Sequence, residues 1–153
     1  MKIGGLVEQR NLALYSITSL KDKPGAAAAV LRLFAKANIN LEYITEGMAQ
    51  DGTAVLAFCI DTDDMKQADE IIKNEIESES HSIKKREFVG IIGIYGPHFR
   101  EKPAIAAAFC NVLGDHHVNI LGISSSISTI SCVIDVRDFE RSKRAVMEVF
   151  ELP

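Results

Sequence analysis

Residues 23–41 have the sequence KPGAAAAVLRLFAKANINL, and residues 102–120 have the sequence KPAIAAAFCNVLGDHHVNI. Each segment begins with Lys-Pro, continues through an alanine-rich amphipathic stretch and ends with Asn between two aliphatic residues. The two prolines are 79 residues apart, and so are Asn40 and Asn119. Repetition at one fixed spacing is typical of a duplicated supersecondary unit. The chain is therefore predicted to hold two similar units, each too small to bury its apolar surface well alone.

The pattern of apolar residues predicts the same order of elements in both halves. In the first half we expect strands at 12–20, 39–45, 53–60 and 82–87, and helices at about 25–37 and 65–76. In the second half we expect strands at 88–95, 118–125 and 130–135, and helices at about 103–113 and 139–150. One further strand is expected near the N-terminus, at about 2–8.

Each half has the order strand–helix–strand–strand–helix and needs a fourth strand to complete a ferredoxin-like βαββαβ unit. The first half has that strand at 82–87. The second half ends after its last helix, whereas the strand at about 2–8 has no place in the first unit. We therefore predict an α+β fold with two ferredoxin-like units in tandem. The first unit, 9–87, would be inserted in the second, 1–8 plus 88–153, and the N-terminal strand would complete the second unit.

Composition and charge exclude several classes of function. Hydrophobic residues make up 47% of the 153, and the net charge of −4 argues against a surface for nucleic acid or anionic membranes. No apolar run reaches the roughly 18 residues needed to span a bilayer, and the N-terminus lacks the apolar stretch of a signal peptide. We therefore expect a cytoplasmic protein.

Three cysteines lie in apolar segments without a Cys-x-x-Cys pair, so we expect free thiols and no metal site.

The turn from the first strand into the first helix, residues 19–27 (the first loop), carries the most specific chemistry. The N–H groups and dipole at a helix N-terminus suit a carboxylate. Gly25 and the alanines after it let a ligand approach the backbone closely, and Asp22 is placed to bind an ammonium group. An α-amino acid requires both complements. The alternative is a plain helix start, with Pro24 at its first position and the alanines packed under the sheet.

These motifs resemble the C-terminal regulatory region of aspartokinase, a tandem pair of ACT domains. The resemblance rests on Asp-Lys-Pro-Gly at 22–25, Asn-Ile-Asn-Leu at 38–41, Val-Asn-Ile at 118–120, Ile-Ser-Ser-Ser at 123–126 and Glu-Val-Phe-Glu-Leu at 148–152. It covers nearly the whole chain. It implies an allosteric feedback sensor in aspartate-family amino-acid biosynthesis, which binds free lysine or threonine between the ACT units of a homodimer. Its partner would be the catalytic domain or subunit of aspartate kinase, a phosphotransferase that acts on the carboxyl group of aspartate.

The resemblance also implies which residues contact the effector. They are Asp22, Lys23, Pro24, Gly25, Ala26, Ala27, Glu46, Asn119, Ile120 and Ser124. Glu46 stands where the family often has Gln, and a carboxylate there would favour a ligand with a second amine, such as lysine; the alternative is a solvated edge residue. In the second loop, residues 96–104, Ala104 replaces the family's Gly. A Cβ crowds close backbone approach, so we expect that loop to be structural or degenerate.

The sequence offers no catalytic machinery of its own. It contains neither Gly-x-x-x-x-Gly-Lys-[Ser/Thr] nor Gly-x-Gly-x-x-Gly. We expect no catalytic residues and no cofactor on this chain, since ATP and magnesium would belong to a kinase domain that it lacks. One alternative is a small acylphosphatase-like enzyme that cradles phosphate in a loop of the same fold, and Phe99-Arg100 is its only support. An RNA-recognition fold is a weaker alternative, because strand-centre aromatics are absent.

Overall fold

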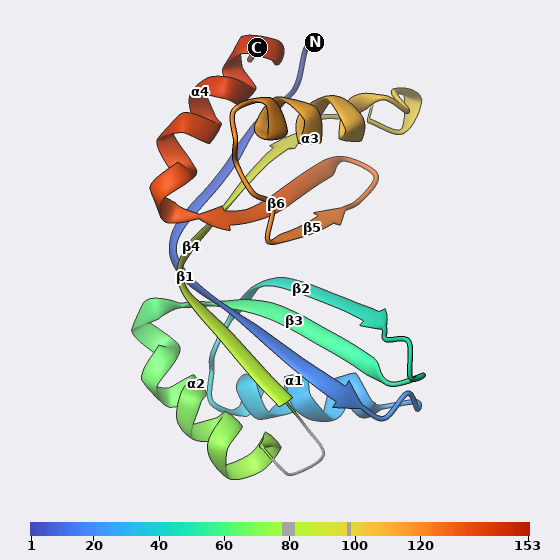
Figure 1. The fold of residues 1–153 in the computed structure, drawn as a ribbon, viewed down its shortest axis with the longest axis vertical. Helices are drawn as coiled ribbons and strands as arrows, with labels where there is room; N and C mark the ends of the chain where they lie inside the picture. The colour runs from blue at the N-terminus through green and yellow to red at the C-terminus, as the bar shows by residue number, and fades with distance from the viewer. Residues whose placement is uncertain (78–81, 98) are drawn as a thin grey trace. The chain divides into compact units, whose positions relative to one another are not determined.

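The computed structural model describes residues 1–77, 82–97 and 99–153. The chain divides into two compact units, shown with their elements labelled in Figure 1. One is Leu12–Glu87, the inserted unit; the other is Met1–Asn11 together with Phe88–Pro153, the split unit. Two long strands, β1 (Gly5–Leu20) and β4 (Ser82–Tyr95), contribute residues to both.

The inserted unit has the strand order β2-β3-β1-β4. After residues 12–20 of β1 come α1 (Ala26–Lys36), β2 (Leu41–Met48), β3 (Ala54–Asp61), a 3-10 turn (Thr62–Asp64), α2 (Met65–Ile71), a π-helical turn (Ile72–Ile76) and residues 82–87 of β4. Both β1 and β2 pair antiparallel with β3. This is the topology of the predicted ferredoxin-like unit.

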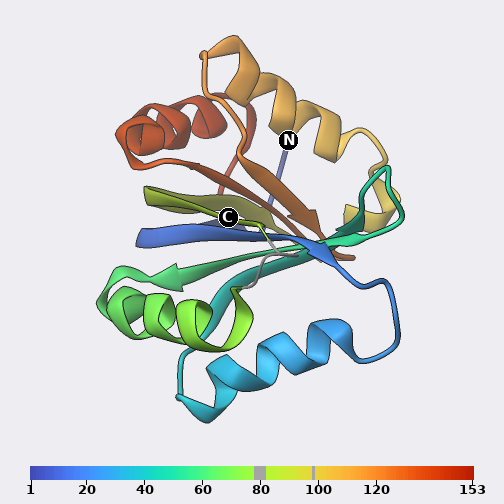
Figure 2. The same ribbon diagram turned by 60° about the horizontal axis from the view of Figure 1, so that its bottom comes forward.

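One face of this sheet is covered by the two helices, as Figure 2 shows. Side chains alternate along a strand, so Leu56 and Phe58 of β3 project to the same face. They are fully buried in a cluster with Phe34 of α1 and Ala68 of α2. The rings of Phe34 and Phe58 meet at 5.0 Å between centroids. This core fixes α1, and with it the position of the first loop.

The split unit has the strand order β1-β4-β6-β5. Residues 5–11 of β1 and 88–95 of β4 join a 3-10 turn (Phe99–Glu101), α3 (Ile105–Asp115), β5 (Gly122–Ser125), β6 (Thr129–Asp135), a 3-10 turn (Val136–Asp138) and α4 (Phe139–Val149). The amide of Gly4 donates to the carbonyl of Tyr95 at 2.7 Å. The prediction that the N-terminal strand completes the second unit, with the first unit inserted, is confirmed.

Two predicted breaks between strands do not occur. The N-terminal strand continues into the strand expected at 12–20, and the strands expected at 82–87 and 88–95 are one strand. Asn11 and Phe88 have left-handed φ values of 60° and 59° within these strands. A residue in that conformation interrupts the regular pleat while the strand goes on pairing. The change of pattern at these positions therefore marks the division between units and not the end of a strand.

The strands after α1 and α3 begin later than predicted, for one shared reason. Asn38 and His117 have φ values of 57° and 56°, and they end their helices in the same way. The amide of Val118 donates to the carbonyl of Leu113 at 2.9 Å, and that of Ile39 donates to Phe34 at 3.0 Å. This is the six-to-one hydrogen bond of a Schellman motif. It delays β5 until Gly122, so residues 118–121 form a connection and not the expected strand.

None of the described helices is long and apolar enough to cross a membrane. Within the described ranges, no three His, Cys, Asp or Glu side chains lie close enough together to hold a metal ion. The three cysteines are free thiols, and Cys59 and Cys132 are buried.

Candidate functional site

The first loop is held by its own backbone at one end of the inserted unit. β1 ends at Leu20, which is buried and pairs with Ala54 after a shift in register. Residues 21–25 are all exposed. The amide of Lys23 donates to the carbonyl of Lys21 at 3.0 Å, and that of Ala26 donates to Lys23 at 3.2 Å. The structure therefore brings Asp22, Lys23, Pro24, Gly25, Ala26 and Ala27 together on a short, ordered turn that solvent reaches.

Gly25 immediately precedes α1 and has a φ of 86° and a ψ of −6°. An ideal Cβ built at this position meets nothing within 4 Å. Glycine is therefore required here by the left-handed backbone, and not because neighbouring atoms crowd the site. The open space at Gly25 leaves the start of α1 accessible to a small molecule.

The start of α1 has amide donors to offer. No side chain caps the helix, and its first turn contains no acidic residue. The amide of Ala26 donates to Lys23, and that of Ala29 donates to Gly25 at 2.9 Å. Among the described residues, the amides of Ala27 and Ala28 are the first-turn donors for which no acceptor is found. Such donors, at the positive end of the helix dipole, bind carboxylates.

Glu46 lies on the edge strand β2, at the end of the sheet where the first loop begins. It pairs with Leu56, two residues along β3 from the Ala54 that pairs with Leu20. Paired residues share a face, so Glu46 projects to the face that carries α1. Its side chain is exposed. The register therefore places a second carboxylate on the same side of the sheet as the helix start.

The other three predicted site residues belong to the split unit. Asn119 and Ile120 lie in the connection between α3 and β5, and Ser124 lies in β5 opposite Ser131. Asn119 is exposed, whereas Ile120 packs partly against the core of its unit. Their grouping with the first loop stays a prediction.

The second loop has the same chain course as the first but a different backbone. Ala104 precedes α3 with a φ of −84° and a ψ of −4°, a right-handed conformation where Gly25 is left-handed. A 3-10 turn buries Phe99, and His98 lies outside the described residues. A pocket of about 480 Å³ nevertheless opens beside this loop. Sequence reasoning missed it, although Arg100 and Lys102 were signals that basic residues gather there.

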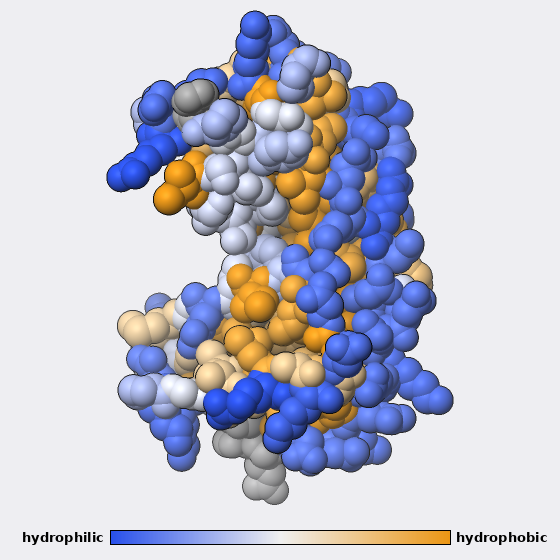
Figure 3. Space-filling model, turned by 180° about the vertical axis from the view of Figure 1, so that it is seen from behind, coloured by the Kyte–Doolittle hydropathy of each residue, from blue (hydrophilic) through white to orange (hydrophobic). Residues whose placement is uncertain are grey.

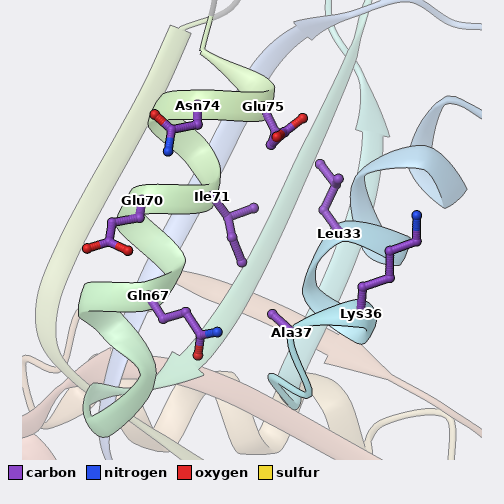
Figure 4. Close-up of a pocket in the computed structure, with 8 residues that line it drawn as sticks. All are labelled: Leu33, Lys36, Ala37, Gln67, Glu70, Ile71, Asn74 and Glu75. Carbon is purple, nitrogen blue, oxygen red and sulfur yellow. The ribbon is translucent and has the colours of Figure 1, made fainter.

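A second hollow, of about 540 Å³, lies between α1 and α2 (Figure 4). Leu33 and Ile71 point toward one another from the two helices, whereas the carboxylate of Glu70 points away from α1. It is lined by Leu33, Lys36, Ala37, Gln67, Glu70, Ile71, Asn74 and Glu75. None of the predicted site residues is among them. Lys36 and Ala37 place it at the C-terminal end of α1, away from the open amides.

A polar network fixes α2 to the sheet of the inserted unit. The buried Tyr15 donates its hydroxyl hydrogen to Asp69 Oδ1 at 2.6 Å, and Lys85 Nζ donates to Asp69 Oδ2 at 2.7 Å. Burial, and then the hydrogen bond to Asp69, raise the pKa of the Tyr15 phenol. The bond to Asp69 raises the pKa of Lys85. This network holds the fold and contains none of the predicted site residues.

Comparison with known sequences identifies both units. Two models of the ACT domain match residues 15–77 and residues 92–150. An aspartokinase of Corynebacterium glutamicum is 30% identical over 151 residues, 97% of this chain and 36% of that protein. An aspartokinase of Pseudomonas aeruginosa is 29% identical over 155 residues, 98% of this chain and 37% of that protein. The chain thus spans little more than a third of the length of these relatives.

Solved structures agree with this assignment. The regulatory subunit of aspartate kinase from Thermus thermophilus matches with a TM-score of 0.86 over 97% of this chain and 99% of that chain; at 23% identity this likeness shows the fold alone. A chain in the crystal structure of aspartokinase alpha and beta subunits matches at 28% identity, with a TM-score of 0.84 over 95% of this chain and 97% of that one. These matches do not favour the acylphosphatase-like alternative. The chain belongs to the ACT domain family, as a tandem pair of the kind that forms the regulatory region of aspartokinases.

Proposed function

We propose that this ACT pair is the allosteric amino-acid sensor of an aspartokinase and binds free lysine or threonine at the first loop. The observation that carries the proposal is the uncapped start of α1 after the left-handed Gly25, with the exposed Asp22 in the turn before it and the exposed Glu46 on the same face of the sheet. Open amides complement the carboxylate of an amino acid, and a carboxylate side chain complements its ammonium. The similarity to aspartokinases supplies the enzyme that such a sensor would serve.

Each part of the ligand has a residue to meet it. The α-carboxylate would accept hydrogen bonds from the amides of Ala27 and Ala28, and Asp22 would pair with the α-ammonium. Glu46 would then pair with the side-chain ammonium of lysine, a group that threonine lacks. Asn119, Ile120 and Ser124 would close the site from a second ACT pair.

The second ACT pair would come from another copy of the chain. β2 is the last strand in the order of the inserted unit, and edge strands present free N–H and C=O groups. Its side chains include the exposed Ile44 and Met48, which are 45% and 76% accessible. Hydrophobic residues also reach the surface on the face seen in Figure 3. An apolar edge of this kind favours a homodimer through ACT units.

Effector binding at such an interface would shift the population toward one arrangement of the dimer. That shift would change the rate at which the catalytic aspartokinase domain or subunit, which would hold ATP and magnesium, phosphorylates aspartate. On this proposal the present chain contributes recognition and not chemistry.

Calorimetric titration with lysine, threonine and methionine tests the proposal. Lysine or threonine should bind saturably, and Asp22→Asn should weaken binding by about tenfold or more, since a hydrogen bond to a charged group contributes about 1.5–3 kcal/mol. Asp63→Asn, an exposed aspartate of the same unit, is the matched control and should leave affinity unchanged. Glu46→Gln should weaken lysine and spare threonine. Equal losses from Asp22→Asn and Asp63→Asn, or no binding of any of the three, would refute the proposed site.

A further inference from the structure

The pocket beside the second loop has walls of two kinds. Its apolar wall includes the buried Phe99, Ile105 and Ile130. Its polar wall includes Arg100, Lys102 and two serines; the full lining is Phe99, Arg100, Lys102, Pro103, Ile105, Ala106, Ser125, Ser126, Ile127 and Ile130. At about 480 Å³ it falls within the size range of small-molecule sites, which combine an apolar lining with a few polar groups.

The pocket is positively charged and contains no carboxylate. Arg100 and Lys102 are the only charged side chains that line it in the described part of the chain. By the spacing of the repeat, Glu101 corresponds to Asp22, but Glu101 does not line the pocket and takes part in an interaction of its own. Ser125 pairs with Ile130 as Glu46 pairs with Leu56, so a serine stands where the first unit has its second carboxylate.

The two cationic side chains differ in the partners that they have within the chain. Lys102 Nζ donates to the backbone carbonyl of Lys2 at 3.4 Å, so this ammonium already has a partner within the unit. Arg100 is exposed, and no ion-pair partner for it is found among the described residues. A guanidinium binds a carboxylate through two parallel hydrogen bonds. Arg100 is therefore the group that is free to hold an anion.

The hairpin over the pocket is tied in place. The amide of Gly96 donates to the carbonyl of Ser128 at 2.8 Å, and that of Ser126 donates to Thr129 at 2.8 Å. These bonds fix the turn between β5 and β6 against the second loop, so the pocket exists before a ligand arrives. Ile127 at the tip of this turn is 68% exposed and lines the pocket, so its apolar surface is available to a ligand.

We infer that this pocket is a second binding site, specific for a small carboxylate that carries an apolar chain and no ammonium group. Arg100 binds the carboxylate, with the serine hydroxyls beside it, and the apolar wall buries the chain. An α-amino acid is disfavoured, because its ammonium would enter a cationic pocket without a carboxylate to pair with. This pocket thus excludes the ammonium group that the proposed ligand of the first loop must carry.

A pair of probes with the same carbon skeleton tests this inference. Titration of the full chain, followed by amide resonances in NMR, compares the 2-oxo acid 4-methyl-2-oxopentanoate with leucine. The 2-oxo acid should shift the amides of Ser125, Ser126 and Ala106 and bind at least tenfold more tightly than leucine. Acetate, which has the carboxylate but not the branched chain, should bind more weakly than the 2-oxo acid.

Arg100→Gln should weaken binding of the 2-oxo acid about tenfold or more. The control is Arg144→Gln, which removes the same charge from an exposed position on α4 and should change affinity less than twofold. Asp22→Asn should leave binding of the 2-oxo acid unchanged, so the experiment tests this pocket separately from the proposed site at the first loop. Equal binding of leucine, equal losses of affinity from the two arginine variants, or no shift at these amides when the parent chain is titrated with the 2-oxo acid would overturn the inference.

Discussion

Alanine at position 25 would add one methyl group to a backbone that has a φ of 86°. Because nothing lies within 4 Å of the new Cβ, the expected penalty is conformational and not steric. A non-glycine residue in the left-handed region costs about 1–2 kcal/mol. In a chain of this size, each kcal/mol lowers the melting temperature by about 2–4 °C, so Gly25→Ala should melt about 2–8 °C lower. Asparagine tolerates the left-handed region better than alanine does, so Gly25→Asn should lower the melting temperature less than Gly25→Ala.

The chain also shows how the variant could escape the strain. Ala104 occupies the equivalent position before α3 and adopts a φ of −84° and a ψ of −4°. If alanine at position 25 relaxed in the same way, stability would recover, but the turn before Ala27 and Ala28 would change. Their amides would then no longer present the same geometry to a carboxylate. Either outcome is measurable: a lower melting temperature, or a lower affinity for the effector.

Gly47→Ala is the matched control. Gly47 also has open space around its Cα, but no positive φ. Alanine there should be neutral, or stabilise by about 0.4–1 kcal/mol through the unfolded state. Differential scanning calorimetry and titration with lysine would be run on both variants. If Gly25→Ala kept both the melting temperature and the affinity of the parent chain, the backbone of the first loop would not be the binding element that we describe.

Three further predictions concern the fold. Gly93→Ala should lower the free energy of unfolding in urea by about 1–3 kcal/mol, because the new Cβ would lie 2.5 Å from a backbone carbonyl oxygen of β6. Gly114→Ala is the control and should not lower it, because nothing lies within 4 Å of its new Cβ. Tyr15→Phe should lose about 1.5–3 kcal/mol by removing a hydrogen bond to a charged partner; an unchanged urea midpoint would contradict this. Burial raises the pKa of Cys59 and Cys132 to about 12, so both thiols should resist alkylation at pH 8. Their raised pKa contributes stability below about pH 9, and that contribution should fall as the pH rises from 9 to 12; a flat unfolding midpoint over that range would contradict it.

The topology could be predicted from the sequence because the repeat shows which elements each unit should contain. The second unit lacked a fourth strand, and the N-terminal strand had no place in the first unit. Insertion of the first unit in the second followed from these two facts. The exact strand limits were not accessible, since they depend on φ values at Asn11, Phe88 and His117. Each of these residues takes a left-handed conformation that its residue type does not require, and tertiary packing decides it.

The candidate sites show the same division between what repeats and what does not. The repeat predicts that both units have a loop before the first helix and an edge hairpin beside it, and the structure confirms that frame. The ligand chemistry depends on residues that differ between the copies. Glu46 lies on the helix-covered face of its sheet where Ser125 stands in the second copy, and the left-handed Gly25 of the first loop corresponds to a right-handed Ala104. The charge of these side chains could be read from the sequence, whereas the face of the sheet on which they lie depends on the pairing register of β2 and β5. On the two proposals made above, the duplicated frame would hold an ammonium-bearing ligand in one unit and exclude it from the other.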